Sequence, residues 1–148
     1  MRSIYYSCAF MVILVTIILG LAGCLNNVCQ NPPPQFYFQI VDAGTIYPSR
    51  PDTNAVIDIW YTQGNEKKMV TDVNKVEDVF QSAMLIIHAQ ESNDQEFTFE
   101  LNRRVIAKIR LETYIDKGKC DGWAHVSKVY QNGKMISKSL TGVYRIGE

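Results

Sequence analysis

Beyond residue 35, apolar and polar residues alternate with the period of two that is typical of half-buried β-strands. The pattern first appears in three stretches, at residues 35–42, 55–61 and 67–73. In the first stretch, the apolar face consists of Phe36, Phe38 and Ile40. Pro48 and Pro51 separate the first two stretches and favour irregular chain between them. We therefore expect three strands in the first half of the chain.

The second half of the chain repeats the strand pattern. The stretches are residues 96–101, 105–115, 123–130, 134–139 and 143–146. The turn between residues 123–130 and 134–139 contains Asn132-Gly133, a dipeptide typical of a type I′ turn, in which both central residues have positive φ. We therefore expect a tight hairpin near the C-terminus.

The sequence pattern of residues 73–89 fits either a helix or a strand. Apolar residues recur at intervals of three and four, as in an amphipathic helix, at Val73, Val76, Phe80, Ala83, Met84 and Ile87. The run of residues 79–87 fits a buried strand equally well. We expect a strand, because the neighbouring segments are strands, and allow a short helical turn near Lys75. The choice between helix and strand stays open at this point.

About eight short strands separated by turns predict an all-β fold. Such a series of strands is typical of an antiparallel two-sheet sandwich. We expect residues 36–148 to form this one domain, which is long enough to bury a core.

The layout of the N-terminal segment predicts an export signal. Residues 9–19 are apolar apart from Thr16, and Arg2 supplies the positive charge that precedes them. This apolar core is shorter than the roughly 20 residues that a transmembrane helix needs. An uncleaved anchor from Ile4 to Leu21, or an ordinary secretory signal with a chance cysteine, are the alternatives.

Leu21-Ala22-Gly23-Cys24, at the end of this segment, resembles the end of a bacterial lipoprotein signal. The resemblance implies that the Cys24 thiol accepts a diacylglycerol, that a peptidase cleaves before Cys24, and that the freed amino group is acylated. Two or more acyl chains hold a protein on a membrane firmly. We therefore expect residues 1–23 to be a cleaved signal and Cys24 to attach the protein to a lipid membrane.

Residues 24–35 form the predicted tether between the lipid and the domain. Pro32, Pro33 and Pro34 favour a semi-rigid extended spacer. A polyproline ligand for a partner domain is the alternative function of this tract.

Charge and cysteine content agree with an exported protein. The chain has 15 basic and 15 acidic residues, and Arg2 leaves with the signal. This near-neutral balance argues against nucleic acid as a partner. Cys8 also leaves with the signal and Cys24 carries lipid, so that Cys29 and Cys120 remain to form a disulfide. The alternative is two reduced thiols.

No arrangement of residues predicts catalysis. His88 and His125 lack the spacing to other ligands that a metal site requires. A weak cation site in the loop with Asp116, Asp121 and His125, and an acid and base pair among Glu91, Asp94 and Glu96, are less favoured than solvated loops. We expect no catalytic residue, no metal and no cofactor, and therefore no enzyme.

Aromatic residues are the candidates for ligand binding. Exposed rings offer a large contact area to a glycan or a protein at low entropic cost. The candidates are Trp60, Tyr61, Trp123 and Tyr130. Burial of both tryptophans in the core of the sandwich is the alternative.

Several short motifs resemble those of small uncharacterised lipoproteins of Bacteroidota-type bacteria. Besides the signal, they are Val41-Asp42, Asp58-Ile59-Trp60-Tyr61, the segment from Phe97 to Asn102, a lone Cys120, and Asn132-Gly133-Lys134. The resemblance implies an immunoglobulin-like or transthyretin-like β-sandwich and brings no known activity. Some of those lipoproteins carry acidic residues directly after the lipidated cysteine, which send them to the cell surface.

The segment from Leu25 to Val28 has no acidic residue. We therefore expect a lipid-anchored protein of the cell envelope on the outer membrane, facing the periplasm rather than the surface. Its expected role is structural, or an interaction with another envelope protein. Binding of a glycan or protein ligand through aromatic residues is the alternative, and an enzyme is the least favoured.

Overall fold

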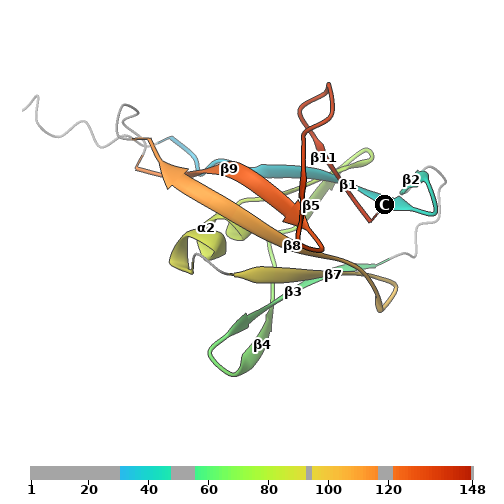
Figure 1. The fold of residues 1–148 in the computed structure, drawn as a ribbon, viewed down its shortest axis with the longest axis horizontal. Helices are drawn as coiled ribbons and strands as arrows, with labels where there is room; N and C mark the ends of the chain where they lie inside the picture. The colour runs from blue at the N-terminus through green and yellow to red at the C-terminus, as the bar shows by residue number, and fades with distance from the viewer. Residues whose placement is uncertain (1–30, 48–55, 93–94, 117–121, 148) are drawn as a thin grey trace, which may run out of the picture. The chain divides into compact units, whose positions relative to one another are not determined.

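The computed structural model describes residues 31–47, 56–92, 95–116 and 122–147. A compact unit extends from Pro32 to Glu148, and its described residues form two β-sheets and one short helix (Figure 1). Among the helices of the described ranges, none is long and apolar enough to cross a membrane.

The first sheet is built around strand β1 (Phe36–Asp42). Its strands follow the order β11-β1-β6-β5, and β2 also pairs with β1. The other members are β2 (Thr45–Tyr47), β5 (Asn74–Val76), β6 (Val79–Ser82) and β11 (Tyr144–Ile146). Strands β1 and β11 run parallel, whereas the remaining pairs are antiparallel.

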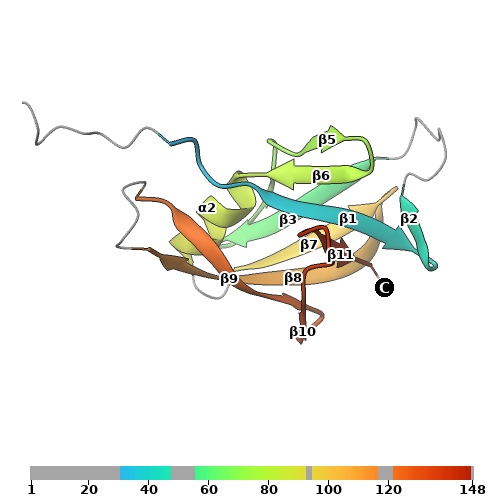
Figure 2. The same cartoon turned by 90° about the horizontal axis from the view of Figure 1, so that it is seen from above.

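The second sheet is antiparallel throughout and has the order β10-β9-β8-β7-β3-β4. Its strands are β3 (Ile57–Gln63), β4 (Glu66–Met69), β7 (Glu96–Leu101), β8 (Arg104–Ile115), β9 (Ala124–Gln131) and β10 (Lys134–Ile136). Figure 2 shows β1 and β6 of the first sheet on one side and the long strands β8 and β9 of the second on the other.

The core lies between the sheets and consists of the apolar faces that the alternation predicts. Phe36, Phe38 and Ile40 of β1 are all buried. The rings of Phe38 and Phe99 meet edge to face at 5.3 Å and so join the two sheets. The predicted all-β, two-sheet sandwich is confirmed.

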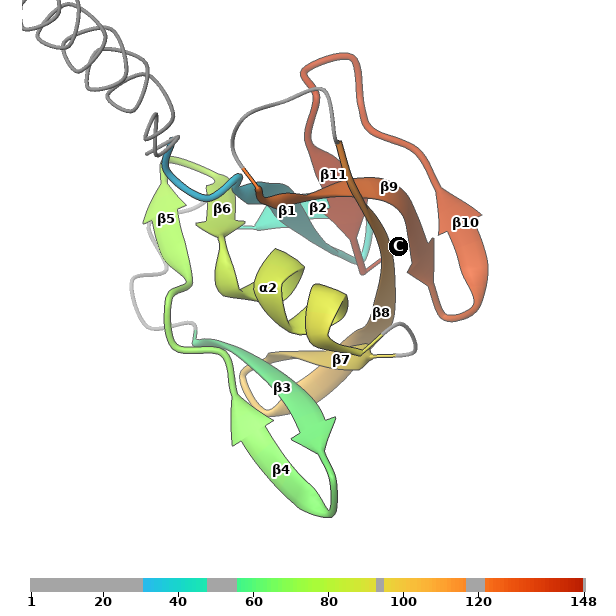
Figure 3. The same ribbon diagram turned by 90° about the vertical axis from the view of Figure 1, so that its left-hand side faces the viewer.

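The expected strand at residues 73–89 is wrong in its second half. After β5 and β6, the chain forms helix α2 (Met84–Glu91), which packs on β8 and β9 and lies between the sheets in Figure 3. The helical turn allowed near Lys75 is a strand instead. Asp72 stabilises the N-terminus of this helix by accepting hydrogen bonds from the backbone N–H groups of Ala83 and Met84, at 2.8 and 3.0 Å.

The predicted hairpin at Asn132-Gly133 is confirmed. Gln131 pairs with Lys134, and φ is +51° at Asn132 and +80° at Gly133, as a type I′ turn requires. Strand β2 is an addition to the predicted strands, ending directly before the proline that favoured irregular chain.

Candidate functional site

Trp60 and Tyr61 are neighbours on β3 but point to opposite sides of the second sheet. Tyr61 is 8% exposed and lies in the core, where its ring stacks on that of His88 at 4.3 Å between centroids. Trp60 lies on the outer face, half-buried. Because residues along a strand alternate between faces, these two aromatic residues do not form one binding platform.

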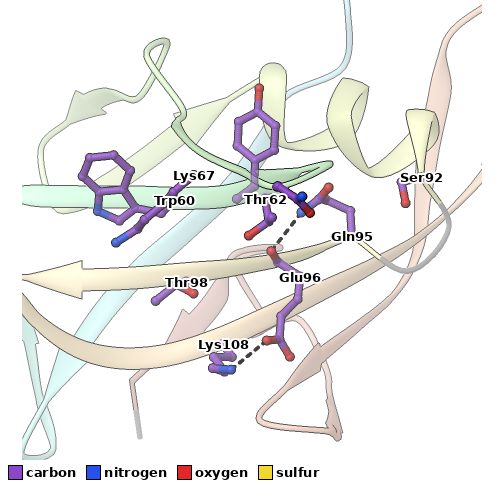
Figure 4. A pocket seen from close by; sticks show the side chains of 10 residues that line it. Trp60, Thr62, Lys67, Ser92, Gln95, Glu96, Thr98 and Lys108 are labelled. Carbon is purple, nitrogen blue, oxygen red and sulfur yellow. Dashed lines mark hydrogen bonds and ion pairs between the residues drawn. The ribbon is translucent and has the colours of Figure 1, made fainter.

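A hollow of about 460 Å³ lies beside Trp60 on the outer face (Figure 4). Strands β3, β4, β7 and β8 and the end of α2 contribute to it. Its lining is mostly polar and comprises Trp60, Tyr61, Thr62, Asn65, Lys67, Ser92, Gln95, Glu96, Thr98 and Lys108. Hydroxyls and amides, which both donate and accept hydrogen bonds, therefore surround one indole ring.

The register of the sheet explains why these side chains meet. Trp60 pairs with Thr98 of β7, and Thr98 pairs with Lys108 of β8. The three therefore form one row across the outer face.

The indole of Trp60 is held by charged neighbours. Its Nε1 donates to Glu100 Oε2 at 3.1 Å. Lys67 Nζ lies 4.4 Å from the ring centroid and 3.4 Å from Glu100 Oε1. The ammonium therefore covers one face of the ring, as in a cation–π contact. A ligand that stacks on this face must displace Lys67, whose side chain is mostly exposed and can move at little cost.

The opposite side of the hollow is also ordered by polar contacts. Glu96 Oε1 lies 3.0 Å from Lys108 Nζ, and Gln95 Nε2 donates to the carbonyl oxygen of Glu96 at 3.0 Å. Figure 4 shows Thr62 and Thr98 between this group and the indole. The arrangement can exchange hydrogen bonds with a polar, uncharged ligand.

Tyr130 and Trp123 lie outside this hollow. Tyr130 packs under Arg110, whose Cζ is 4.2 Å from the ring centroid. Hydrogen bonds from Lys128 and then from Tyr130 hold the pKa of Glu112 below its usual value, so that β8 and β9 share a charged network. Trp123 is partly buried just before β9. Of the four predicted ligand residues, only Trp60 therefore combines a location in the hollow with exposure on the outer face.

A second hollow, of about 260 Å³, lies at another part of the sandwich. The start of β1, the end of β8 and the start of β9 border it, and its lining includes Tyr37, Tyr114, His125 and Tyr144. The rings of Tyr114 and His125 are 5.8 Å apart.

Of the residues considered for catalysis or metal binding, His88 and Glu91 lie side by side in the described part of the chain. His88 Nδ1 lies 3.1 Å from Glu91 Oε2, in addition to its stack on Tyr61. Within the described ranges, no group of three or more His, Cys, Asp or Glu side chains can hold a metal ion. The predicted lipidation site Cys24, the predicted disulfide partners Cys29 and Cys120, and Asp94 and Asp121 all lie outside the described residues.

The aromatic pattern alone missed Lys67, Gln95 and Glu100, which hold the indole or line the hollow. Glu100 could have been found from the alternation on β7, where it lies between the buried Phe99 and Leu101, whereas Lys67 lies on β4 and Gln95 precedes β7. Recognition of the site also required the pairing of β3 with β7, which are far apart in sequence.

No family model matches the sequence, and neither the curated proteins nor the solved structures contain a match.

Proposed function

We propose that this chain is a lipid-anchored protein of the bacterial cell envelope whose β-sandwich serves as a structural or interaction module. The observation that carries the proposal is the sequence Leu21-Ala22-Gly23-Cys24 at the end of an apolar export segment. A compact unit with its own buried core begins at Pro32, shortly after the cysteine. Its partners are the membrane, reached through acylated Cys24, and another envelope protein.

The location that fits these features is the outer membrane, with the domain facing the periplasm. Leu25-Asn26-Asn27-Val28 directly after Cys24 carries no acidic residue. The proposal includes no catalytic step, metal or cofactor. The near-neutral charge of the chain gives no attraction to nucleic acid.

Growth with labelled palmitate tests the anchor. The wild type should incorporate the label, whereas Cys24→Ser should stay unlabelled and keep the mass of the precursor. Cys29→Ser is the matched control and should be labelled like the wild type. Equal labelling of Cys24→Ser and the wild type would contradict the proposal. Affinity purification of the membrane-extracted protein then identifies the envelope partner.

A second candidate function is the binding of a glycan in the hollow beside Trp60. The supporting observation is the combination of one indole with Thr62, Thr98, Gln95 and the other polar groups of the lining. Sugar hydroxyls both donate and accept hydrogen bonds, as do these hydroxyls and amides. An aromatic ring adds apolar contact with the carbon-bound hydrogens of a sugar ring.

Tryptophan fluorescence tests this second function. In Trp123→Phe, all tryptophan emission comes from Trp60, since the chain has two tryptophans. Soluble peptidoglycan fragments and neutral oligosaccharides are the probes, and a saturable change in emission is expected. Thr98→Val should weaken the response, whereas Tyr130→Phe, outside the hollow, should not. Unchanged emission with every probe would exclude the glycan site.

The disulfide between Cys29 and Cys120 is a further part of the proposal. In an oxidising envelope compartment, an even pair of cysteines tends to be oxidised. Peptide mapping without reductant should recover one linked peptide that contains both residues. Recovery of two free thiols would contradict the bridge.

A further inference from the structure

Strands β4 and β10 are the two edges of the second sheet. Each pairs with one neighbouring strand of the described chain, across a two-residue turn, and has no partner strand on its other side. Figure 3 shows β10 on the right, beyond β9. The free side of an edge strand can pair with another extended chain, so that the side chains along it decide what binds there.

The register of the β9–β10 hairpin shows where the backbone of β10 points. Gln131 and Lys134 pair directly across the two-residue turn, and such a pair exchanges backbone hydrogen bonds. The next pair, Tyr130 and Met135, therefore has no hydrogen bonds between its members. The N–H and carbonyl groups of Met135 thus point away from β9, towards the free edge.

A hollow of about 380 Å³ follows this edge. Residues 134–139 line it without interruption, and Arg145 of β11, an edge strand of the first sheet, completes the lining. Side chains along a strand alternate between its two faces. The unbroken series of lining residues therefore indicates that the hollow follows the edge of β10 and not one of its faces. Met135, which is 58% exposed, offers apolar contact there.

The lining of this hollow carries three positive charges and no carboxylate. The charged members are Lys134, Lys138 and Arg145, and all three are exposed. Within the described ranges, none of the three forms an ion pair. The Nζ of Lys138 lies 5.6 Å from the ring centroid of Tyr144, a contact that leaves its charge without a carboxylate. The hollow therefore favours a negatively charged ligand.

The opposite edge of the sheet differs in this respect. On β4, Lys67 Nζ lies 3.4 Å from Glu100 Oε1, and Lys68 Nζ lies 3.8 Å from Glu66 Oε2. Carboxylates of the domain itself therefore balance the positive charges of β4, whereas they do not balance those of β10. Lysines on an edge strand also repel a second copy of the same edge.

We propose that the free edge of β10 binds an extended acidic segment of another envelope protein, which joins the second sheet as a further strand. The inference rests on the proposed role as an interaction module, and it gives that role a surface and a partner chemistry. Backbone hydrogen bonds with Met135 supply affinity. Lys134, Lys138 and Arg145 select carboxylates.

Hydrogen exchange at two methionines tests the proposal. Of the five methionines, Met1 and Met11 leave with the expected signal, so that Met69, Met84 and Met135 remain. The full lipidated chain is labelled with isotope-enriched methionine and kept in a neutral detergent. Met69 is the internal control, because it lies on the edge strand β4, is 45% exposed, and occupies a pair without hydrogen bonds by the same alternation.

The probe is a capped heptapeptide in which glutamate alternates with valine. At about ten times its Kd, it should slow exchange of the Met135 N–H about tenfold and leave that of Met69 unchanged. The same peptide with lysine in place of glutamate should give no protection. An acidic peptide with an N-methylated backbone should give none either, because it keeps the charge but cannot form the ladder of backbone hydrogen bonds.

Charge reversal gives the matched variants. Lys134→Glu together with Lys138→Glu should weaken binding of the acidic peptide about tenfold or more. Lys68→Glu together with Lys75→Glu changes the net charge equally, at exposed positions of β4 and β5, and should alter binding by less than about twofold. High salt should weaken binding to the wild type, because it screens exposed charges.

Four results would overturn the proposal. They are no protection of Met135 by the acidic peptide, equal protection of Met69, equal protection by the lysine peptide, and equal protection by the N-methylated peptide. Protection of Met135 that grows with protein concentration without peptide would assign the edge to a second copy instead. Protection by phosphatidylglycerol micelles alone would assign it to lipid headgroups instead. Peptide binding in detergent needs no acyl chain, so that labelling with palmitate at Cys24 tests the anchor separately.

Discussion

The side chain of Asp72 holds the N-terminus of helix α2 through Met84, twelve positions later. Asp72 Oδ2 accepts the N–H of Met84 at 3.0 Å and that of Ala83 at 2.8 Å, and Oδ1 accepts the hydroxyl of Ser82 at 2.6 Å. Ser82 Oγ in turn accepts the N–H of Leu85 at 3.3 Å. Two side chains thus satisfy three of the N–H groups that a helix leaves without an internal partner. The same contacts fix the chain where it passes from β4 of one sheet to β5 of the other.

Asp72→Ala should therefore lower the free energy of unfolding by about 1–3 kcal/mol, since it leaves part-buried N–H groups without an acceptor. Asp72→Asn keeps one oxygen as an acceptor and should lose less. Urea unfolding of both variants and the wild type measures the difference. Identical midpoints for Asp72→Ala and the wild type would show that the cap does not stabilise the fold.

The same contacts explain why sequence reasoning failed at residues 73–89. Helix α2 has only eight residues, so its periodicity covers about two turns and resembles that of a buried strand. Its own N-cap residue, Ala83, provides no side-chain cap. The signal for the helix lies in Asp72, and its contact with Met84 exists only after β5 and β6 have folded back as a hairpin. The local pattern of apolar residues therefore does not show the contact that marks the start of the helix.

The strands were more predictable than the site. The burial pattern of β7 follows the alternation of apolar residues throughout, and that of β1 follows it as far as Ile40, after which Val41 is buried as well. The row of Trp60, Thr98 and Lys108 depends instead on which strands are neighbours. Between β3 and β7 the chain forms three strands and a helix, so their pairing is invisible in a local pattern.

Arg103 occupies a position that favours glycine. In the turn from β7 to β8 its φ is +66°, and that of Asn102 is +50°. Such a conformation costs about 1–2 kcal/mol for an ordinary L-residue, whereas glycine adds about 0.5–1 kcal/mol of chain entropy to the unfolded state. Arg103→Gly should therefore raise the free energy of unfolding by about 0.5–1 kcal/mol. Arg103→Ala keeps the strain and should bring no such gain in the denaturant midpoint. Equal midpoints for the two variants would argue against strain at this position.

Burial raises the pKa of the Tyr144 phenol, and this shift predicts how stability changes in alkali. In the unfolded chain the Tyr144 phenol ionises near pH 10, which is a lower pH than in the folded protein. The contribution of the neutral Tyr144 phenol to the free energy of unfolding is complete below about pH 10. It is lost as the pH rises towards the pKa that the phenol has in the folded protein. Tyr144→Phe keeps the ring that stacks on Phe36 at 5.2 Å and removes the ionisation.

The free energy of unfolding of Tyr144→Phe should therefore decrease less steeply above pH 10 than that of the wild type. Tyr114→Phe, at an exposed tyrosine, is the control and should follow the wild type. Chemical denaturation at a series of pH values measures the slopes. Parallel curves for Tyr144→Phe and the wild type would refute the assignment.

Gly133 provides the most direct test of the link between a turn and the whole fold. A Cβ atom at this position would meet no atom within 4 Å, so any effect of a substitution arises from the backbone φ of +80° alone. A β-branched residue adopts such a φ only with strain. The turn also places Gln131, whose Oε1 accepts the N–H of Gly147 directly after β11, so that it connects the second sheet to the first.

Gly133→Val should lower the free energy of unfolding by at least about 1 kcal/mol, the scale of strain at an incompatible backbone position. Gly133→Asn is the matched control and should lose less, because asparagine enters the left-handed region more readily than other side chains. Denaturant midpoints of the two variants and the wild type separate strain from the mere presence of a side chain. If Gly133→Val unfolds at the wild-type midpoint, the type I′ turn does not determine the pairing of β9 with β10, and the connection through Gln131 has to form without it.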